Sequence, residues 1–345
     1  MATATAARIA PAQGGAMRYW KLYVTAFLLI WLLLVTRFGF WDGVRHHWQM
    51  ALVMIAGSLV AGSTPMGGGT VAFPILVLVF GQNPNNARNF GLIIQALGMT
   101  SALIFMIGRR VPIPVRILVG STAGAAIGFG IGTFLIAPHV QAGLVKLLFS
   151  CLWMSFGVLT LLRNTEICGL KGRGPGETLN AELVGCVAGL IGGTMASMIG
   201  VGVEMAVYTL MVLVFRTDLK IAIPTAVAAA ALASIEGAFL HLHLGDIDSD
   251  ALYNWLAAGP IVIFGAPIGT WLVTKLPRIK VLYFVSTLCV LQFVWTLQQT
   301  AHTRTEWLFT GGALLVAASV LFTLYRTGKR KDVASLPATA AAVTG

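Results

Sequence analysis

The chain has 345 residues, of which 57% are hydrophobic and 10% are charged. Ordinary soluble domains carry roughly 25% charged residues, so this composition excludes a soluble protein and leaves no room for a second soluble domain. The net charge of +11 does not indicate a nucleic-acid partner. The basic residues lie at the ends of apolar runs, as expected beside the cytoplasmic face of a lipid bilayer.

Apolar runs that could each cross a membrane follow one another along the chain. A spanning helix needs about 20 residues, and eight uninterrupted runs come close to this length. They cover 22–38, 87–107, 115–136, 141–162, 220–243, 251–274, 279–298 and 307–325. The end of the first run contains no small-residue cleavage site, so we interpret it as a retained anchor and not as a signal peptide.

Two further apolar segments, 50–80 and 180–215, are broken by glycine and echo each other. The first contains Gly67-Gly68-Gly69 and the second Gly200-Val201-Gly202. Both end in Val-Leu-Val-Phe, at 77–80 and at 212–215, which is an offset of 135 residues. Broken backbone inside a membrane is tolerated only where it is buried in protein or lines a polar cavity. Such breaks at matching places in two halves of a chain indicate the binding site of a transporter.

The distribution of Lys and Arg predicts the topology. If each broken segment returns to the side from which it enters, 18 of the 23 basic residues fall on one side, which is then cytoplasmic and holds both termini. The predicted fold is an all-α polytopic membrane protein with two inverted-topology repeats, 50–162 and 180–298, each containing a glycine-broken helical hairpin. A cytoplasmic linker, 163–179, joins them, while 1–49 and 299–345 each add one helix. The charges do not distinguish re-entrant hairpins from two short crossings.

The first glycine turn and the residues after it are candidates for binding an anion. Glycines at a helix start expose backbone N–H groups, and the partial positive charge there attracts anions. Arg88 follows among amide side chains and offers a planar donor fork that suits oxyanions. Alternatively, the glycines only permit tight packing, and Arg88 is an exposed residue at a helix start. The candidate substrate-binding residues are Thr64, Gly67, Gly68, Gly69, Thr70, Arg88, Asn89, Gly200, Gly202 and Thr225.

Glu204 and Glu236 are the acidic residues that interrupt apolar runs. An ionised carboxylate is costly inside a membrane, so such a residue is expected to be functional or paired. Because burial favours the neutral form, either carboxyl could bind and release a proton and so couple transport to a proton gradient. The alternative is a role in pairing one helix with another.

A stretch of His and Asp residues invites a metal-site interpretation. It contains His241, His243, Asp246, Asp248 and Asp250. Histidines two residues apart on a helix point in different directions and would not bind one metal together. We therefore expect a solvated extracellular loop here, and no metal or cofactor.

Gly120, Gly124, Gly128 and Gly132 recur every four residues in the run 115–136. They form a smooth ridge along one helix face, which predicts a close contact with another helix. That helix belongs either to the same chain or to the second subunit of a homodimer.

At these residues the chain resembles the sulfite exporter TauE/SafE family of bacterial inner-membrane proteins. The resemblance rests on the turn 67–69 followed by Pro74, on the helix starts at Ala87 and at 222–225, and on the duplicated layout. It covers about 50–298. It implies efflux of sulfite or a small organosulfur anion across the cytoplasmic membrane. The glycine motif is less complete in the second half, where Glu204 follows it.

Together these features predict a secondary transporter that is not an enzyme and exports sulfite or a related anion by alternating access, with Glu204 and Glu236 as candidates for coupling this transport to protons. A passive anion channel built on the same hairpins is an alternative. An intramembrane metal-dependent enzyme using the stretch 241–250 is a second, and a scaffold protein that binds no small anion is a third.

Overall fold

Helices make up the secondary structure of the computed structural model, which describes residues 17–172, 174, 179–300 and 303–334. Within these residues the only other element is an isolated bridge between Gly172 and Thr217. The prediction of an all-α polytopic membrane protein is therefore confirmed.

Eight helices of the described part of the chain are long and apolar enough to cross a membrane. They are α1 (Met17–Arg37), α5 (Pro84–Gly108), α6 (Val115–Ile131) continued by η2 (Gly132–Ile136), α9 (Leu179–Ile199), α11 (Leu219–Leu244), α12 (Ser249–Lys275), α13 (Arg278–Thr300) and α14 (Arg304–Ala334). Seven of them coincide with predicted runs. The remaining run, 141–162, forms α7 (Ala142–Leu162), whose apolar part is shorter. The eighth candidate span is instead α9, which is the first arm of the second broken segment.

Each broken segment folds back along itself. The first consists of α3 (Trp48–Ser63), a glycine turn, α4 (Gly69–Pro74) and the π-helical η1 (Ile75–Val79), and the second of α9, α10 (Val203–Thr209) and the π-helical η3 (Leu210–Val214). A Cβ atom placed on Gly57 would lie 3.7 Å from Val71 Cβ, and one on Gly192 would lie 2.9 Å from the Val203 nitrogen. In both segments the second arm thus packs against the first.

The two segments also end in the same way, again at an offset of 135 residues. Each π-helical turn leads to a residue with positive φ, Gly81 (φ 64°) or Arg216 (φ 52°). Two residues later Asn83 and Asp218 cap the next helices, α5 and α11, by accepting backbone N–H groups at 2.9 and 3.0 Å. Such caps satisfy donors that a helix start leaves free. The matching ends of the two segments in the sequence thus also share their backbone conformation and their helix caps.

The first and second halves of the chain pack against each other through pairs of helices. Helix α6 lies along α9, and α12 lies along α3. A methyl group on Gly120, Gly124 or Gly128 would overlap the backbone of α9, approaching nitrogens of that helix to 3.1, 2.8 and 2.8 Å. The predicted glycine ridge therefore provides a close helix contact within the chain. The alternative, a contact with the second subunit of a homodimer, draws no support from it.

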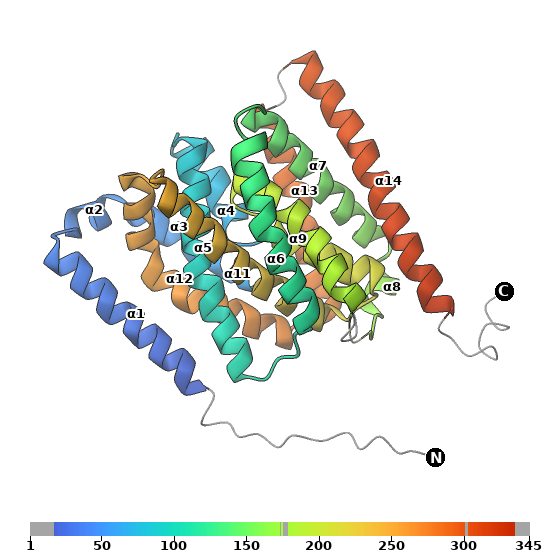
Figure 1. Ribbon diagram of the computed structural model, residues 1–345, viewed down its shortest axis with the longest axis horizontal. Helices are drawn as coiled ribbons and strands as arrows, with labels where there is room; N and C mark the ends of the chain where they lie inside the picture. The colour runs from blue at the N-terminus through green and yellow to red at the C-terminus, as the bar shows by residue number, and fades with distance from the viewer. Residues whose placement is uncertain (1–16, 173, 175–178, 301–302, 335–345) are drawn as a thin grey trace.

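Helices α5 and α11 lie in the middle of the bundle, whereas α1 and α14 lie on opposite flanks (Figure 1). Apolar side chains on the flanking helices stay uncovered, such as Leu33 at 64% and Leu315 at 73% exposure. Surfaces of this kind suit contact with lipid tails. Two short helices complete the structure, α2 (Trp41–His46) before α3 and α8 (Asn164–Cys168) after α7.

Candidate functional site

The glycine turns of both broken segments meet against the middle of α5. Gly67 has φ +71°, and a Cβ atom on it would overlap Glu204 Oε1 of α10 and lie 2.9 Å from Gln95 Oε1 of α5. The amide Nε2 of Gln95 donates a hydrogen bond of 3.1 Å to the carbonyl oxygen of Gly200. One glutamine thus contacts the turns of both segments.

Two buried acceptor oxygens at this meeting point have no donor among the described residues. They are Gln95 Oε1 and Glu204 Oε1, whose residues are 2% and 3% exposed. The other carboxyl oxygen, Glu204 Oε2, accepts the Gly202 N–H at 3.3 Å. Leaving a buried acceptor unpaired is unfavourable. A neutral Glu204 would carry an O–H group, the donor that these oxygens lack.

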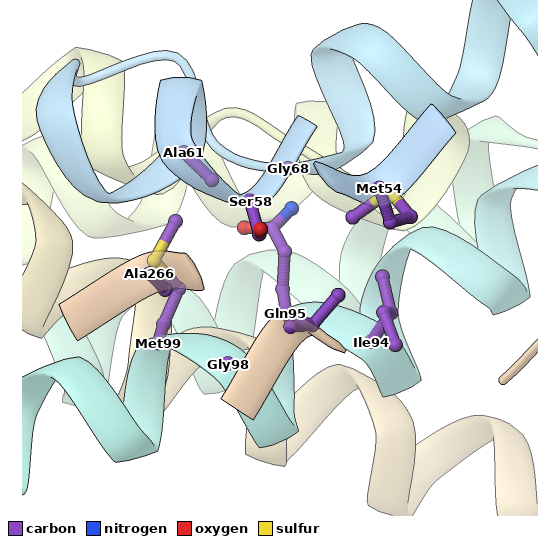
Figure 2. Close-up of a pocket in the computed structure, with 10 residues that line it drawn as sticks. Met54, Ser58, Ala61, Gly68, Ile94, Gln95, Gly98, Met99 and Ala266 are labelled. Carbon is purple, nitrogen blue, oxygen red and sulfur yellow. The ribbon is translucent and has the colours of Figure 1, made fainter. Parts of the chain in front are cut away.

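The cavity beside Gln95 is small. The Gln95 side chain reaches from α5 toward Ser58 and Gly68 across a cavity of about 10 Å³ (Figure 2). Such a volume holds about one water molecule and is too small for an oxyanion. The wall is otherwise mostly apolar and includes Met54, Met99 and Val262. The cavity as it stands in this structure therefore holds no oxyanion.

Arg88 lies in the first turns of α5, on the N-terminal side of Gln95. Its side chain is 8% exposed. Its Nη2 donates to Asp246 Oδ2 at 3.0 Å, and its Nε donates to Asn89 Oδ1 at 3.0 Å. The Asn89 amide donates to the Asp246 carbonyl at 2.8 Å. His241 Nδ1 lies 2.9 Å from Asp246 Oδ2. The alternative of an exposed arginine at a helix start is therefore wrong.

The expectation of a solvated loop is wrong for His241 as well. This residue belongs to α11 and is 1% exposed, because Arg88 and Asp246 cover it. His243 is exposed, in agreement with the expectation. Among the residues that the structure describes, no group of three or more His, Cys, Asp or Glu side chains could hold a metal ion.

Arg88 connects this cluster to the second glycine turn. Its Nη1 donates to the carbonyl oxygen of Ser197 at 3.4 Å. A Cβ atom on Gly200 would lie 2.9 Å from the Arg88 carbonyl oxygen. Asp246, Arg88, Gly200 and Gln95 therefore follow one another as neighbours from a half-exposed loop to the buried meeting point, where Gly67 lies beside both Gln95 and Glu204.

The other candidate residues are more scattered. The hydroxyls of Thr64 and Thr225 donate within their own helical turns, to Val60 and Ile221, at 2.9 and 2.7 Å. Gly68 lines the cavity beside Gln95, Gly69 begins α4, and the side chain of Thr70 lies outside the described residues. Glu236 is half-buried on α11, with a buried Oε2 that has no donor in the described part of the chain.

Gln95, Asp246 and His241 were not among the substrate-binding or proton-coupling residues predicted from the sequence. Gln95 did carry a signal, since an amide in the middle of a long apolar helix needs a buried partner. Asp246 and His241 carried none, because their pattern is also that of a surface loop.

A family model described as sulfite exporter TauE/SafE matches residues 50–296. The chain belongs to the TauE/SafE family. The match includes both broken segments, Arg88, Gln95, Glu204 and Asp246, and leaves α1 and α14 outside. Membership identifies a membrane protein that exports sulfite or a related anion, and it confirms the resemblance seen in the sequence. Searches of curated proteins and of solved structures gave no match to this TauE/SafE protein.

Proposed function

We propose that this protein exports sulfite or a related small organosulfur anion across the bacterial cytoplasmic membrane by alternating access, driven by protons. The observation that carries the proposal is the meeting of both glycine turns at Gln95 and Glu204. Broken helices that meet inside the membrane are where secondary transporters bind substrates and coupling ions.

The proposed architecture is a pair of inverted repeats with both termini in the cytoplasm. Two observations support two related halves. The broken segments have matching ends, and each half packs a helix against the other half, in the pairs α3–α12 and α6–α9. The distribution of basic residues supports their opposite orientation. Alternating access then follows when one half rocks against the other and opens the contact at Gln95 to each side in turn.

The substrate is assigned to the donors that surround this path. Backbone N–H groups of the turn 67–69 offer neutral donors for an oxyanion, and Arg88 and Asn89 offer side-chain donors. The N–H groups of Gly200 and Gly202 are secondary candidates, because they already donate to the Ala196 carbonyl oxygen at 2.7 Å and to Glu204 Oε2 at 3.3 Å. These residues attract an anion without placing an uncompensated positive charge at the meeting point. Thr64 and Thr225 are secondary candidates, since their hydroxyls already donate within their own turns.

The proton is assigned first to Glu204. Its carboxyl is buried, has an oxygen without a donor in the described residues and contacts both glycine turns, through Gly202 and Gly67. Ionisation of Glu204 would place a buried negative charge near Gln95 Oε1, which is also an acceptor. This disfavours the arrangement in which both glycine turns pack at Gln95. Glu236 is the second candidate because it also has a buried oxygen without a donor in the described residues.

Transport of labelled sulfite into proteoliposomes loaded with unlabelled sulfite tests the proposal. An alternating-access carrier shows counterflow, and an imposed pH gradient changes its net transport. A passive channel conducts without counterflow, and this result would contradict alternating access. Vesicles without protein are the control, and sulfate, thiosulfate and sulfonates are the competitors that define the substrate.

A further inference from the structure

We propose that the Asp246 carboxylate is a plug that occupies an oxyanion site made by Arg88, Asn89 and His241, and that an anion leaving the protein displaces it. This inference rests on the proposed function, because it assigns a gate to the same export path.

The site around the Asp246 carboxylate is already built. Arg88 Nη2 lies 3.0 Å from Oδ2, His241 Nδ1 lies 2.9 Å from Oδ2, and Asn89 Nδ2 lies 3.4 Å from Oδ1. Asn89 and His241 are 0% and 1% exposed, so these donors are held in place by packing. Arg88 reaches the carboxylate through Nη2 alone, because its Nε and Nη1 donate to Asn89 Oδ1 and to the Ser197 carbonyl oxygen. A charge-assisted hydrogen bond of this kind forms with other oxyanions as well as with a carboxylate. The donor set is therefore suited to sulfite.

Asp246 lies on a loop, whereas the side chains that bind it lie on helices. The donors stand on α5 and α11, whereas Asp246 stands on the short connection between α11 and α12. This connection begins at Gly245, whose φ of +68° ends α11. The Asp246 side chain is 40% exposed, while the Arg88 side chain is 8% exposed. A movement of the connection would uncover Arg88 without disturbing either helix.

Arg88 also faces the buried meeting point. Its Nη1 bonds to Ser197, and its carbonyl oxygen lies against Gly200 of the second glycine turn. Asp246 covers Arg88 on one side, and the turn covers it on the other. An anion that passes from Gln95 toward the loop therefore meets Arg88 before it reaches solvent, and Asp246 competes with it for the same donors.

A purely structural ion pair makes a different prediction. In that case sulfite binds elsewhere, and removing the carboxylate only leaves Arg88 buried without a counter-charge, which lowers stability. If Asp246 is a plug, removing its charge strengthens sulfite binding as well, because the competitor is gone.

The experiment measures the affinity of the purified full-length protein for sulfite, by calorimetry under anaerobic conditions. We expect Asp246→Asn to tighten sulfite binding by about tenfold or more, since a hydrogen bond between charged groups is worth that factor. The matched control is Asp250→Asn, which removes the same charge from the same region but does not contact Arg88. It should leave the affinity unchanged. In an Arg88→Gln background, Asp246→Asn should bring no gain.

Thermal unfolding of each variant shows whether it is folded, and Asp246→Ser, which is also neutral, replaces Asp246→Asn if the latter does not fold. Equal sulfite affinities in wild type, Asp246→Asn and Asp250→Asn would overturn the plug and leave the proposed function standing. The same gain in the Arg88→Gln background would also overturn it. Absence of sulfite binding in every variant would overturn the proposed function and the plug together.

Discussion

Gln95 of α5 donates a 3.1 Å hydrogen bond to the carbonyl oxygen of Gly200, and by this bond the middle of one half of the protein holds the glycine turn of the other half. The same side chain lies beside Gly67, in the turn of its own half. Any motion that separates the two turns has to break or move the contacts of Gln95. The glutamine therefore provides a contact that holds the two turns together.

Gln95→Leu is expected to change the rate of sulfite transport by about tenfold, because it removes about 1.4 kcal/mol of interaction that holds the two turns together. Leucine keeps the apolar volume but leaves the Gly200 carbonyl without its donor. Transport into proteoliposomes measures the effect. Gln292→Leu is the control, because Gln292 of α13 lines a separate apolar cavity behind the first hairpin. Equal transport in both variants would contradict the role of Gln95.

Gly67→Ala and Gly68→Ala are expected to differ sharply although the positions are adjacent. Gly67 has positive φ, and a methyl group there would overlap Glu204, so alanine should lower the free energy of unfolding by about 1–3 kcal/mol. Gly68 has φ −72°, and its nearest atoms would lie 3.5 Å or more away. Alanine at Gly68 should stay within about 0.5 kcal/mol of wild type. Thermal unfolding in detergent compares them, and equal midpoints would contradict the tight contact at Gly67.

Glu204→Gln is expected to bind and exchange sulfite but to lose the response to a pH gradient. Glutamine keeps the shape and the hydrogen bonding of a neutral carboxyl, and it cannot release a proton. The measurement is counterflow and gradient-driven transport of the same preparation. Glu236→Gln serves as the parallel variant. If Glu204→Gln retains full gradient-driven transport, the coupling role passes to Glu236 or to neither residue.

Glu166→Gln is expected to remove a pH-dependent part of the stability. Burial alone would raise the pKa of Glu166, but the hydrogen bond from Tyr325 and the charge of Arg216 hold the pKa below its usual range. A carboxyl with a lowered pKa stabilises the fold above its unfolded-state pKa, and this stability is lost as the pH falls through the folded-state value.

Wild type should therefore lose stability between neutral and acidic pH, whereas Glu166→Gln should start about 1–3 kcal/mol lower and change less. Unfolding midpoints recorded from pH 7 downwards compare the two. Glu182→Gln is the control, because Glu182 forms a more exposed ion pair with Arg116 at 2.8 Å. Exposed pairs contribute about 0–1 kcal/mol. A pH profile of Glu166→Gln that parallels wild type would argue against the stabilising role of this cluster.

Single cysteines at Asn85 and Asp248 are expected to react with a membrane-impermeant reagent added to intact cells. Cysteines at Arg109, Lys171 and Lys329 should react only after the membrane is opened. The expectation follows from the 18 of 23 basic residues that fall on one side in the proposed topology. Reaction of position 171 from outside would exclude the inverted orientation of the two halves.

The local patterns of the sequence were sufficient for much of the fold. Apolar runs of spanning length predicted all but one of the helices that could cross a membrane, because hydrophobicity over about 20 residues is a property of the run itself. The glycine breaks at 67–69 and 200–202 predicted the two turns for the same reason, since a turn in a membrane segment needs residues that permit it. The exception was α9, where the break concealed a helix that is long enough on its own.

What surrounds each polar side chain was decided by tertiary packing. Arg88 and Asp246 are far apart in the chain, and each stands in a pattern that equally fits an exposed helix start or a loop. Their pairing, the burial of His241 and the contact of Gln95 with both turns arise only when α5, α11 and the two hairpins pack together. The sequence by itself therefore determined the membrane class, the spans and the family. Only the tertiary structure decided which donors face which acceptors, because desolvation and hydrogen bonding depend on neighbours that no local pattern contains.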